Sequence, residues 1–157
     1  MQKITTFLAY DNQAEEAVDL YVSLFPDSRI LNKSYYGEDS PMPAGTLMTV
    51  QFVLAGQEYI ALNGGSYFTL TDGMSLSVAC ESQEEVDFLW KKLSEGGEPG
   101  PCGWLKDRFG LSWQINPIVL GQMLGDEDRE RAGRVMQAML KMGKIEIAEL
   151  QRAYDGE

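Results

Sequence analysis

The sequence predicts an α+β fold in which two βαβββ modules are followed by C-terminal helices. Three observations support this fold class. A strand pattern followed by a helical pattern occurs near residues 4–25 and again near residues 75–93, with further strand patterns after each helix. A hairpin signal closes the second module, because two strand-like runs within residues 102–117 flank a turn at 107–110 that ends in glycine. Helical spacing of apolar residues then returns after residue 126.

The first module is expected over about residues 1–65. Residues 4–10 alternate as a strand, and Asn12 with Glu15 has the form of a capping box, which marks the start of a helix. Pro26 ends that helix. Three further strand patterns complete the module, near residues 29–36, 46–54 and 58–63.

The second module is expected over about residues 74–117, after a linker at 66–73. Residues 75–80 alternate as a strand, and Ser82 with Glu85 forms a second capping box. The helix ends at two glycines, and the hairpin supplies the last strands. The helices are expected on one side of the sheet, because their apolar stripes need the apolar strand faces as a partner.

Residues 118–157 are expected to form a C-terminal helical extension. Apolar residues between 132 and 140 have helical spacing, Gly143 interrupts the pattern, and residues 144–154 resemble a second short helix. A stripe that contains methionine is typical of core or subunit packing. The paired modules, residues 1–117, and the extension are expected to form one structural domain, which suits a chain of 157 residues.

The charge of the chain argues against several classes of partner. The 24 acidic and 13 basic residues give a net charge of −11. Such a surface repels phosphate backbones and anionic lipids, so neither nucleic acid nor membrane is an expected partner. No apolar run approaches the ~20 residues that span a bilayer, and no signal-peptide core is present. We therefore expect a cytoplasmic protein.

The sequence contains no histidine, which is the commonest metal ligand and the usual general base near neutral pH. This excludes Ser-His and Cys-His catalytic pairs and His-rich zinc sites, although an all-carboxylate metal site stays open. Cys80 and Cys102 are expected to be buried thiols in strands, as in a reducing compartment. No metal and no cofactor are predicted, and no catalytic residue is assigned.

One face of the predicted strands carries neutral polar and small side chains. Its members are Thr5, Phe7, Thr49, Gln51, Tyr59, Ala61, Asn63, Ser75, Ser77, Ser112, Gln114 and Asn116. Solvated faces usually carry lysine and glutamate, so an uncharged face suits a recessed cavity that binds a compact organic molecule. A solvated outer face is the alternative. Seven of these residues are the predicted ligand-binding residues: Thr5, Phe7, Gln51, Asn63, Ser75, Ser77 and Gln114.

Several tracts of the chain carry a family resemblance. They are Ala61-Leu62-Asn63-Gly64-Gly65, the acidic start of the second helix at 84–87, the hairpin at 102–114, and the tail at 144–150. With these tracts the chain resembles PhnB-like proteins, also labelled 3-demethylubiquinone 3-methyltransferase-like, of the glyoxalase/bleomycin-resistance/dioxygenase (vicinal oxygen chelate) superfamily. The resemblance implies that the paired modules form a cupped mixed sheet, commonly in a homodimer.

The same resemblance bears on metal binding. Metal-dependent members of the superfamily hold the ion with His, Glu or Gln on the first and last strands of each module. The corresponding positions here are Thr5, Ala61 or Asn63, Ser75 and Gln114. A neutral amide such as Gln114 cannot hold a divalent cation alone in water. We therefore expect a metal-free protein that binds a small organic molecule in the cup.

Two other functions stay open. The first is a superfamily enzyme, of the lyase, isomerase or oxygenase type or the methyltransferase of the family label, with a recruited metal or a base such as Asp107, Tyr35 or Tyr59. A methyltransferase would need a site for a nucleotide-like cofactor, and no glycine-rich strand-to-helix loop suits one. The second is a docking surface for another protein on the acidic C-terminal helices.

Overall fold

The structure is a computed structural model that describes residues 2–157, and the chain divides into two compact units, Met1–Leu70 and Thr71–Glu157. Each unit contains a four-stranded sheet of its own. The boundary between the units falls in the segment predicted as a linker, and the C-terminal extension belongs to the second unit. The arrangement of the whole chain as one structural domain stays a prediction.

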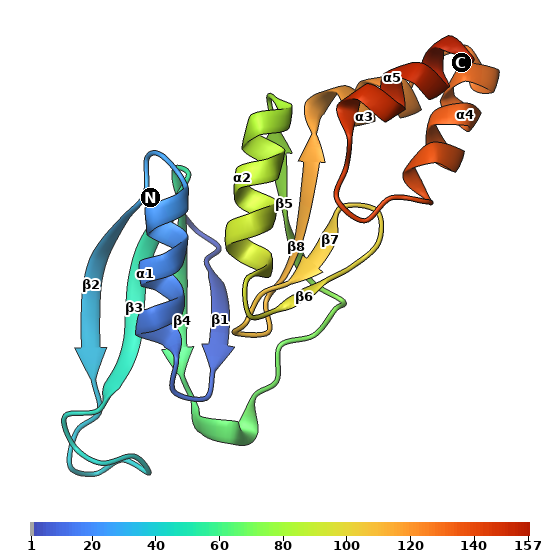
Figure 1. Cartoon of the computed structure of the whole chain (residues 1–157). Helices are drawn as coiled ribbons and strands as arrows, with labels where there is room; N and C mark the ends of the chain where they lie inside the picture. Colours follow the sequence, from blue (N-terminus) through green and yellow to red (C-terminus); the bar gives the residue numbers. More distant parts are fainter. Residues whose placement is uncertain (1) are drawn as a thin grey trace. The chain divides into compact units, whose positions relative to one another are not determined.

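The first unit contains one helix and one mixed sheet. Its elements are β1 (Thr6–Tyr10), α1 (Ala14–Leu24), β2 (Arg29–Tyr35), β3 (Leu47–Leu54), β4 (Gln57–Asn63) and the short 3₁₀ helix η1 (Gly65–Tyr67). The strands are ordered β1-β4-β3-β2, and only the outer pair β1 and β4 is parallel. Helix α1 lies across one face of this sheet (Figure 1) and packs on β3 and β4.

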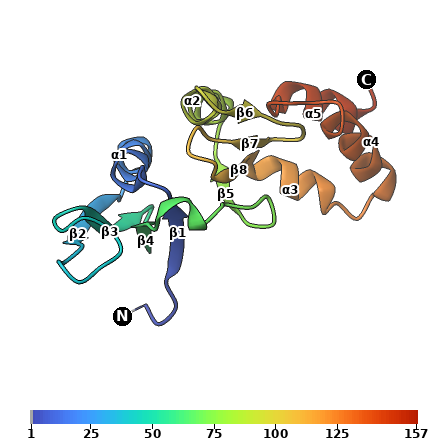
Figure 2. The ribbon, with the colours of Figure 1, turned by 90° about the horizontal axis from the view of Figure 1, so that it is seen from below.

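The second unit repeats this plan. Its module consists of β5 (Ser75–Cys80), α2 (Gln83–Ser94), β6 (Glu98–Pro99), β7 (Trp104–Lys106) and β8 (Ser112–Pro117). The order β5-β8-β7-β6, with a parallel β5–β8 pair, is equivalent to that of the first sheet. Helix α2 covers one face of the second sheet as α1 covers the first (Figure 2). The predicted α+β fold with two βαβββ modules is therefore confirmed.

Three helices form the C-terminal extension: α3 (Ile118–Leu124), α4 (Arg129–Met139) and α5 (Ile147–Asp155). The sequence predicted the second and third of these but not α3. The helices enclose a small core of their own, made of Leu120, Met123, Val135, Met142, Ile145 and Leu150. Of the predicted stripe, Met136 and Leu140 remain 39% and 54% exposed. None of the helices in residues 2–157 has the length and apolar character needed to cross a bilayer.

The extension is bound to the module largely through its backbone. Gln83 at the start of α2 uses both ends of its amide: Nε2 donates to the carbonyl of Ile145 at 2.9 Å, and Oε1 accepts from the N–H of Ile147 at 2.7 Å. The N–H groups of residues 102–103 donate to the carbonyls of residues 142–143, both at 2.8 Å. The extension is thus held on the side of β7 as well as on α2.

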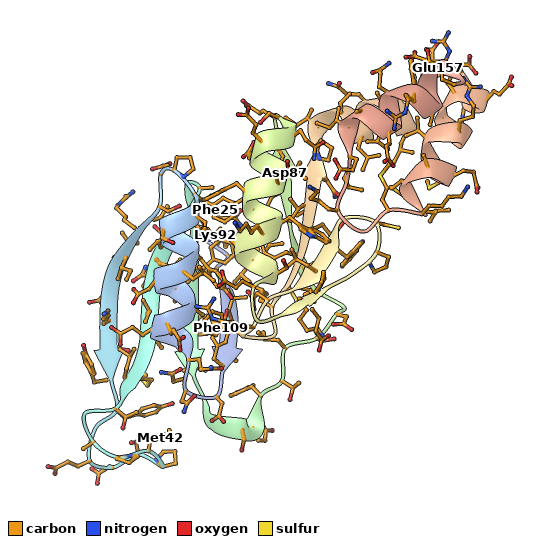
Figure 3. The ribbon with its side chains drawn as sticks, viewed as in Figure 1. Phe25, Met42, Asp87, Lys92, Phe109 and Glu157 are labelled. Atoms are coloured by element: carbon orange, nitrogen blue, oxygen red, sulfur yellow. The ribbon has the colours of Figure 1, made fainter. Side chains whose placement is uncertain are left out.

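An ion pair supports the same contact. The ammonium Nζ of Lys144 lies 2.6 Å from Oδ1 of Asp87, which projects from α2 (Figure 3). The hydrogen bond from Lys144, with a second one from Gln83, lowers the pKa of the Asp87 carboxyl below its ordinary value.

The start of α2 follows its sequence signal. Ser82 Oγ accepts from the N–H of Glu85 at 3.2 Å, as a capping box requires. The Glu85 carboxylate reaches one residue further than the standard motif and accepts from the N–H of Glu81 at 2.8 Å. The predicted capping residues are therefore confirmed.

The predicted capping box of α1 is wrong. Asn12 is exposed, and the helix begins after Gln13 without a side-chain cap from its own segment. The first helical N–H, that of Ala14, instead donates to Oδ1 of Asn63 at 2.9 Å. Glu15 pairs with Lys33 of β2. A residue at the end of β4 thus provides the acceptor that Asn12 was expected to provide.

The predicted face of β4 is also wrong. Tyr59, Ala61 and Asn63 are only 7%, 0% and 5% exposed and lie on the core side of the sheet, whereas Ile60 and Leu62 lie on the opposite side. A two-residue turn at Ala55-Gly56, with φ of 47° and 83°, pairs Leu54 with Gln57 and Phe52 with Tyr59. Directly paired residues share a face, so this register turns Tyr59 toward the core.

Candidate functional site

The polar face of the second sheet lies opposite α2. Across the parallel β5–β8 pair, Ser75 and Ser77 are in register with Ser112 and Gln114. Trp104 of β7 is in register with Gln114, which places its indole on the same face. The alternate residues of β8, including Trp113, are buried on the α2 side, whereas those of β5 at 76 and 78 are half-buried. The prediction for this face is therefore correct in β5 and β8.

Hydrogen bonds link the polar side chains of this face. Gln114 Nε2 donates to Ser75 Oγ at 3.0 Å, and Asn116 Nδ2 donates to Gln114 Oε1 at 3.5 Å. Within residues 2–157, the buried Oδ1 of Asn116 has no hydrogen-bond partner. It lies against Gly103, where a Cβ atom would come within 2.7 Å and where φ is +83°. Only glycine accommodates this approach, so Gly103 allows the Asn116 side chain to lie beside β7.

A hollow of about 390 Å³ lies over this part of the face. Its floor and sides come from β5, β8 and the start of β7, and its remaining wall comes from α3 and α4. The lining residues are Ser77, Val78, Ala79, Cys102, Trp104, Gln114, Asn116, Pro117, Ile118, Leu120, Gly121, Leu124 and Met139. None of them is charged. The volume falls in the range of roughly 300–1,000 Å³ that is typical of small-molecule sites.

A second hollow, of about 440 Å³, shares Trp104 with the first but is charged. Lys106 Nζ lies 2.8 Å from Asp72 Oδ1, and Ser112 Oγ donates to the same oxygen at 3.4 Å. The hydrogen bond from Lys106 lowers the pKa of Asp72. Glu98 and Lys106 are in register with Ser112 of the polar face, so this face, predicted from residues of the other strands, becomes charged at the β6–β7 edge.

The first sheet presents a different surface. Phe7 of β1 and Gln51 of β3 both pair with Ile60 of β4, so these three residues share the face opposite α1. Phe7 is 57% exposed, whereas Gln51 is half-buried. Thr5 is half-buried immediately before β1. With Ile60 and Leu62 on it, this face is more apolar than the sequence predicted.

Asn63 does not lie on the predicted binding face. Its side chain is buried, with Oδ1 accepting from Ala14 and Nδ2 donating to the carbonyl of Leu47 at 3.2 Å. Its own carbonyl accepts from the hydroxyl of Tyr36 at 2.6 Å. Both ends of the amide therefore serve the first unit's fold. Of the seven predicted site residues, the structure brings together Ser75, Ser77 and Gln114 in one unit and Phe7, Gln51 and Thr5 in the other.

The residues considered as bases lie outside the uncharged hollow. Asp107 is buried in the β7–β8 turn, where Oδ1 accepts from the N–H groups of Phe109 and Leu111 at 2.9 and 3.1 Å. Its Oδ2 accepts from Nε1 of Trp113 at 2.9 Å. These bonds give Asp107 a role in holding the hairpin. Tyr59 is buried in the first unit, and burial raises the pKa of its hydroxyl.

The two thiols differ in their surroundings. Cys80 is buried at the end of β5, and burial raises its pKa to about 12. Cys102 is half-buried, lies in the turn before β7 with φ of 57°, and lines the uncharged hollow. The prediction that both thiols lie in strands is therefore wrong for Cys102.

The positions that correspond to superfamily metal ligands do not fit a divalent cation. Ala61 has no donor atom, the Asn63 amide is occupied within the first unit, and Ser75 accepts from Gln114. Within residues 2–157, no three side chains of the His, Cys, Asp or Glu types gather where they could hold a metal ion. An amide and hydroxyls without a carboxylate are weak ligands for hard divalent cations.

Comparison with known proteins identifies the family. A family model described as 3-demethylubiquinone-9 3-methyltransferase matches residues 2–116. The chain belongs to this family. The PhnB protein from Bacillus cereus is 40% identical over 74% of this chain and 99% of its own, with a TM-score of 0.65. The family match ends before α3, so the extension lies beyond it.

Two further solved structures illustrate how the similarity falls off, and of these only the first supports the fold. The protein PA1353 from Pseudomonas aeruginosa is 24% identical over 74% of this chain and 98% of its own, with a TM-score of 0.61. The fosfomycin resistance protein FosX from Listeria monocytogenes is 15% identical over 74% of this chain and 93% of its own, with a TM-score of 0.49. None of the curated proteins matches the chain. The resemblance to PhnB-like proteins is confirmed, whereas membership of the vicinal oxygen chelate superfamily stays a prediction.

Proposed function

We propose that this family member binds a small organic molecule, without a metal ion, in the uncharged hollow on the polar face of its second sheet. The observation that carries the proposal is the floor of this hollow, where the side chains of Ser77, Gln114 and Asn116 face a space of about 390 Å³. An apolar cavity with a few convergent polar groups is typical of a small-molecule site.

Gln114 is the residue best placed to orient a ligand. Its amide offers both a donor and an acceptor, and its position is fixed by bonds to Ser75 on one side and Asn116 on the other. The indole of Trp104 provides a flat apolar surface at the side of the hollow. A ligand with one hydrogen-bonding group and one apolar face matches this arrangement.

Thermal-shift screening with uncharged metabolites tests the proposal. Compounds that raise the melting temperature of the wild-type chain should bind Gln114→Ala about tenfold or more weakly, because the substitution leaves the ligand's polar group without a partner. Gln151→Ala is the matched control, since Gln151 is exposed on α5. Equal binding to both variants would remove Gln114 and the hollow from the site.

Elemental analysis of the purified protein tests the metal-free part of the proposal. We expect no stoichiometric Ni, Zn, Mn or Fe, and no change in melting temperature on treatment with EDTA, because the available donors are amides and hydroxyls. One equivalent of a divalent metal per chain, with loss of stability on chelation, would instead favour a metal-dependent superfamily enzyme.

The name of the family favours methyl transfer as a second candidate. A nucleoside-type methyl donor is commonly bound at a glycine-rich turn between a strand and a helix. The connections from β1 to α1 and from β5 to α2, at residues 11–13 and 81–82, contain no glycine. Calorimetric titration with S-adenosylmethionine distinguishes the candidates: saturable binding would support methyl transfer, and no binding supports the binding-protein proposal.

We also infer a cytoplasmic homodimer. The apolar face of the first sheet, with Phe7, Ile60 and Leu62, is typical of a surface that another chain covers. The acidic surface and the free thiols suit a reducing, soluble compartment. Sedimentation equilibrium tests the assembly, and a chain that stays monomeric at micromolar concentration would contradict it.

A further inference from the structure

The uncharged hollow has a wall that the family match does not include. Helices α3 and α4 contribute Ile118, Leu120, Gly121, Leu124 and Met139 to the lining. The family match ends at residue 116, and 74% of this chain covers 99% of the Bacillus cereus relative. We propose that α3 and α4 act as a selectivity wall that restricts the hollow to uncharged ligands with an apolar ring or chain. This inference rests on the proposed function and adds the class of ligand.

The wall is held in place from both ends. Helix α3 begins directly after Pro117, the last residue of β8, so the chain has no loop between the floor and the wall. On its other side, α3 packs through Leu120 and Met123 into the core of the extension. Arg134 of α4 donates to the carbonyls of residues 153–154 at 2.8 and 2.7 Å. The wall residues are therefore positioned by buried contacts and hydrogen bonds of the extension itself.

The chemistry of the lining excludes charge from the ligand. None of the lining residues is an aspartate, glutamate, lysine or arginine. An ion that entered this hollow would lose part of its hydration without gaining a counter-charge, which disfavours its binding. The net charge of −11 disfavours anions further. Charged groups occur in the neighbouring hollow, where Lys106 is already paired with Asp72.

The two sides of the hollow define the rest of the ligand. Gln114 and Asn116 on the floor bind a polar group, whereas Leu124 and Met139 on the wall and the indole of Trp104 contact apolar surface. Methionine and leucine adapt to rings and chains of varied shape without a directional requirement. The ligand class is accordingly a neutral molecule with one polar end and one apolar body.

Gly121 offers a direct test of the wall. It lies on α3 in the lining, and a Cβ atom added there would meet nothing within 4 Å. Gly121→Leu therefore places a branched side chain at the hollow without a backbone clash, and it favours the helix. Gly133→Leu is the matched control, because Gly133 is equally open on α4 but does not line this hollow. Circular dichroism should show both variants folded.

The probes are a charge-matched pair of dyes, N-phenyl-1-naphthylamine and its anionic relative 8-anilino-1-naphthalenesulfonate, followed by fluorescence titration. The neutral dye should bind the wild-type chain about tenfold or more tightly than the anionic dye, and Gly121→Leu should weaken its binding by about tenfold or more, with Gly133→Leu unchanged. The proposal of a selectivity wall would be overturned by any of three results. These are equal binding of the two dyes, no binding of the neutral dye, and equal effects of the two leucine variants.

The same variants separate this inference from the proposed function. If metabolites found by thermal shift bind in a Gln114-dependent way while Gly121→Leu has no effect, the polar floor is the site and the wall inference fails alone. If Gln114→Ala and Gly121→Leu both leave binding unchanged, the hollow is not the site and both proposals fail.

Discussion

Replacing Asn63 by alanine should destabilise the protein strongly and leave ligand binding unchanged. The substitution removes the acceptor of the Ala14 N–H, which is fully buried at the start of α1, and the donor to the Leu47 carbonyl. A buried donor left without a partner costs about 1–3 kcal/mol, and the second hydrogen bond contributes about 1 kcal/mol. The free energy of unfolding should therefore fall by about 2–4 kcal/mol.

Asn12→Ala is the matched control for this prediction. Asn12 is the residue that sequence signals place at the start of α1, yet it is exposed and caps nothing. Its loss should change the free energy of unfolding by less than about 0.5 kcal/mol. Guanidinium denaturation followed by far-UV circular dichroism measures both values. A cost for Asn12→Ala equal to that of Asn63→Ala would refute the assignment of the cap, and a loss of ligand binding in folded Asn63→Ala would refute its purely structural role.

Three further predictions concern the second unit. Asp107→Asn keeps an acceptor for the turn but places an amide donor opposite the indole N–H of Trp113. The free energy of unfolding, followed by tryptophan fluorescence, should therefore fall by about 2 kcal/mol. An unchanged unfolding midpoint would contradict this prediction. Lys144→Met should lower the free energy of unfolding by less than about 1 kcal/mol near neutral pH, because its partner Asp87 is half-exposed. The pKa of Asp87 in the folded protein lies below its ordinary value of 3.8. The stabilisation by Lys144 is therefore present above pH 3.8 and is lost as the pH falls through the folded pKa. The unfolding curves of the wild-type protein and Lys144→Met should converge in acid. At about pH 8, Ellman's reagent should label Cys102 in the folded protein. Cys80 should react only after the chain unfolds, because it is buried and its pKa is raised to about 12. Labelling of the folded Cys102→Ser variant would contradict this prediction.

The elements of the fold were predictable because their signals are local. The Ser82–Glu85 pair starts α2, and the glycine at 110 closes the β7–β8 turn with φ of +94°. Alternation within β5 and β8 correctly placed Ser75, Ser77 and Gln114 on one face, because period two is fixed by strand geometry.

The face of β4 could not be read from hydrophobicity, because both of its faces carry apolar residues. What decides the face is the register set by the turn at Ala55-Gly56. A two-residue turn ending in glycine is itself a recognised hairpin signal, and applying it would have paired Leu54 with Gln57 and turned Asn63 inward. The cap from Asn63 to Ala14 joins residues 49 positions apart, which no local pattern reveals.

The wall of the hollow was missed for a related reason. Helix α3 spans Ile118–Leu124, too short for a clear apolar period, and its N-terminus has no side-chain cap. Pro117 precedes α3 as its N-cap residue and not at the first helical position, where proline is a helix-start signal. Trp104 and Cys102 reach the hollow only because β7 pairs with β8 and the preceding turn folds against residues 142–143.

The two hydrogen bonds of the Gln83 side chain attach the extension to the module through residues that do not line the hollow. An amide that binds a main-chain carbonyl and a main-chain N–H is indifferent to which side chains stand at 145–147. The anchor and the wall also occupy different helices, since the wall residues come from α3 and α4. Substitutions at Gly121, Leu124 or Met139 can therefore alter the lining of the hollow without removing the hydrogen bonds of Gln83. The extension is accordingly a suitable region for engineering new ligand preferences.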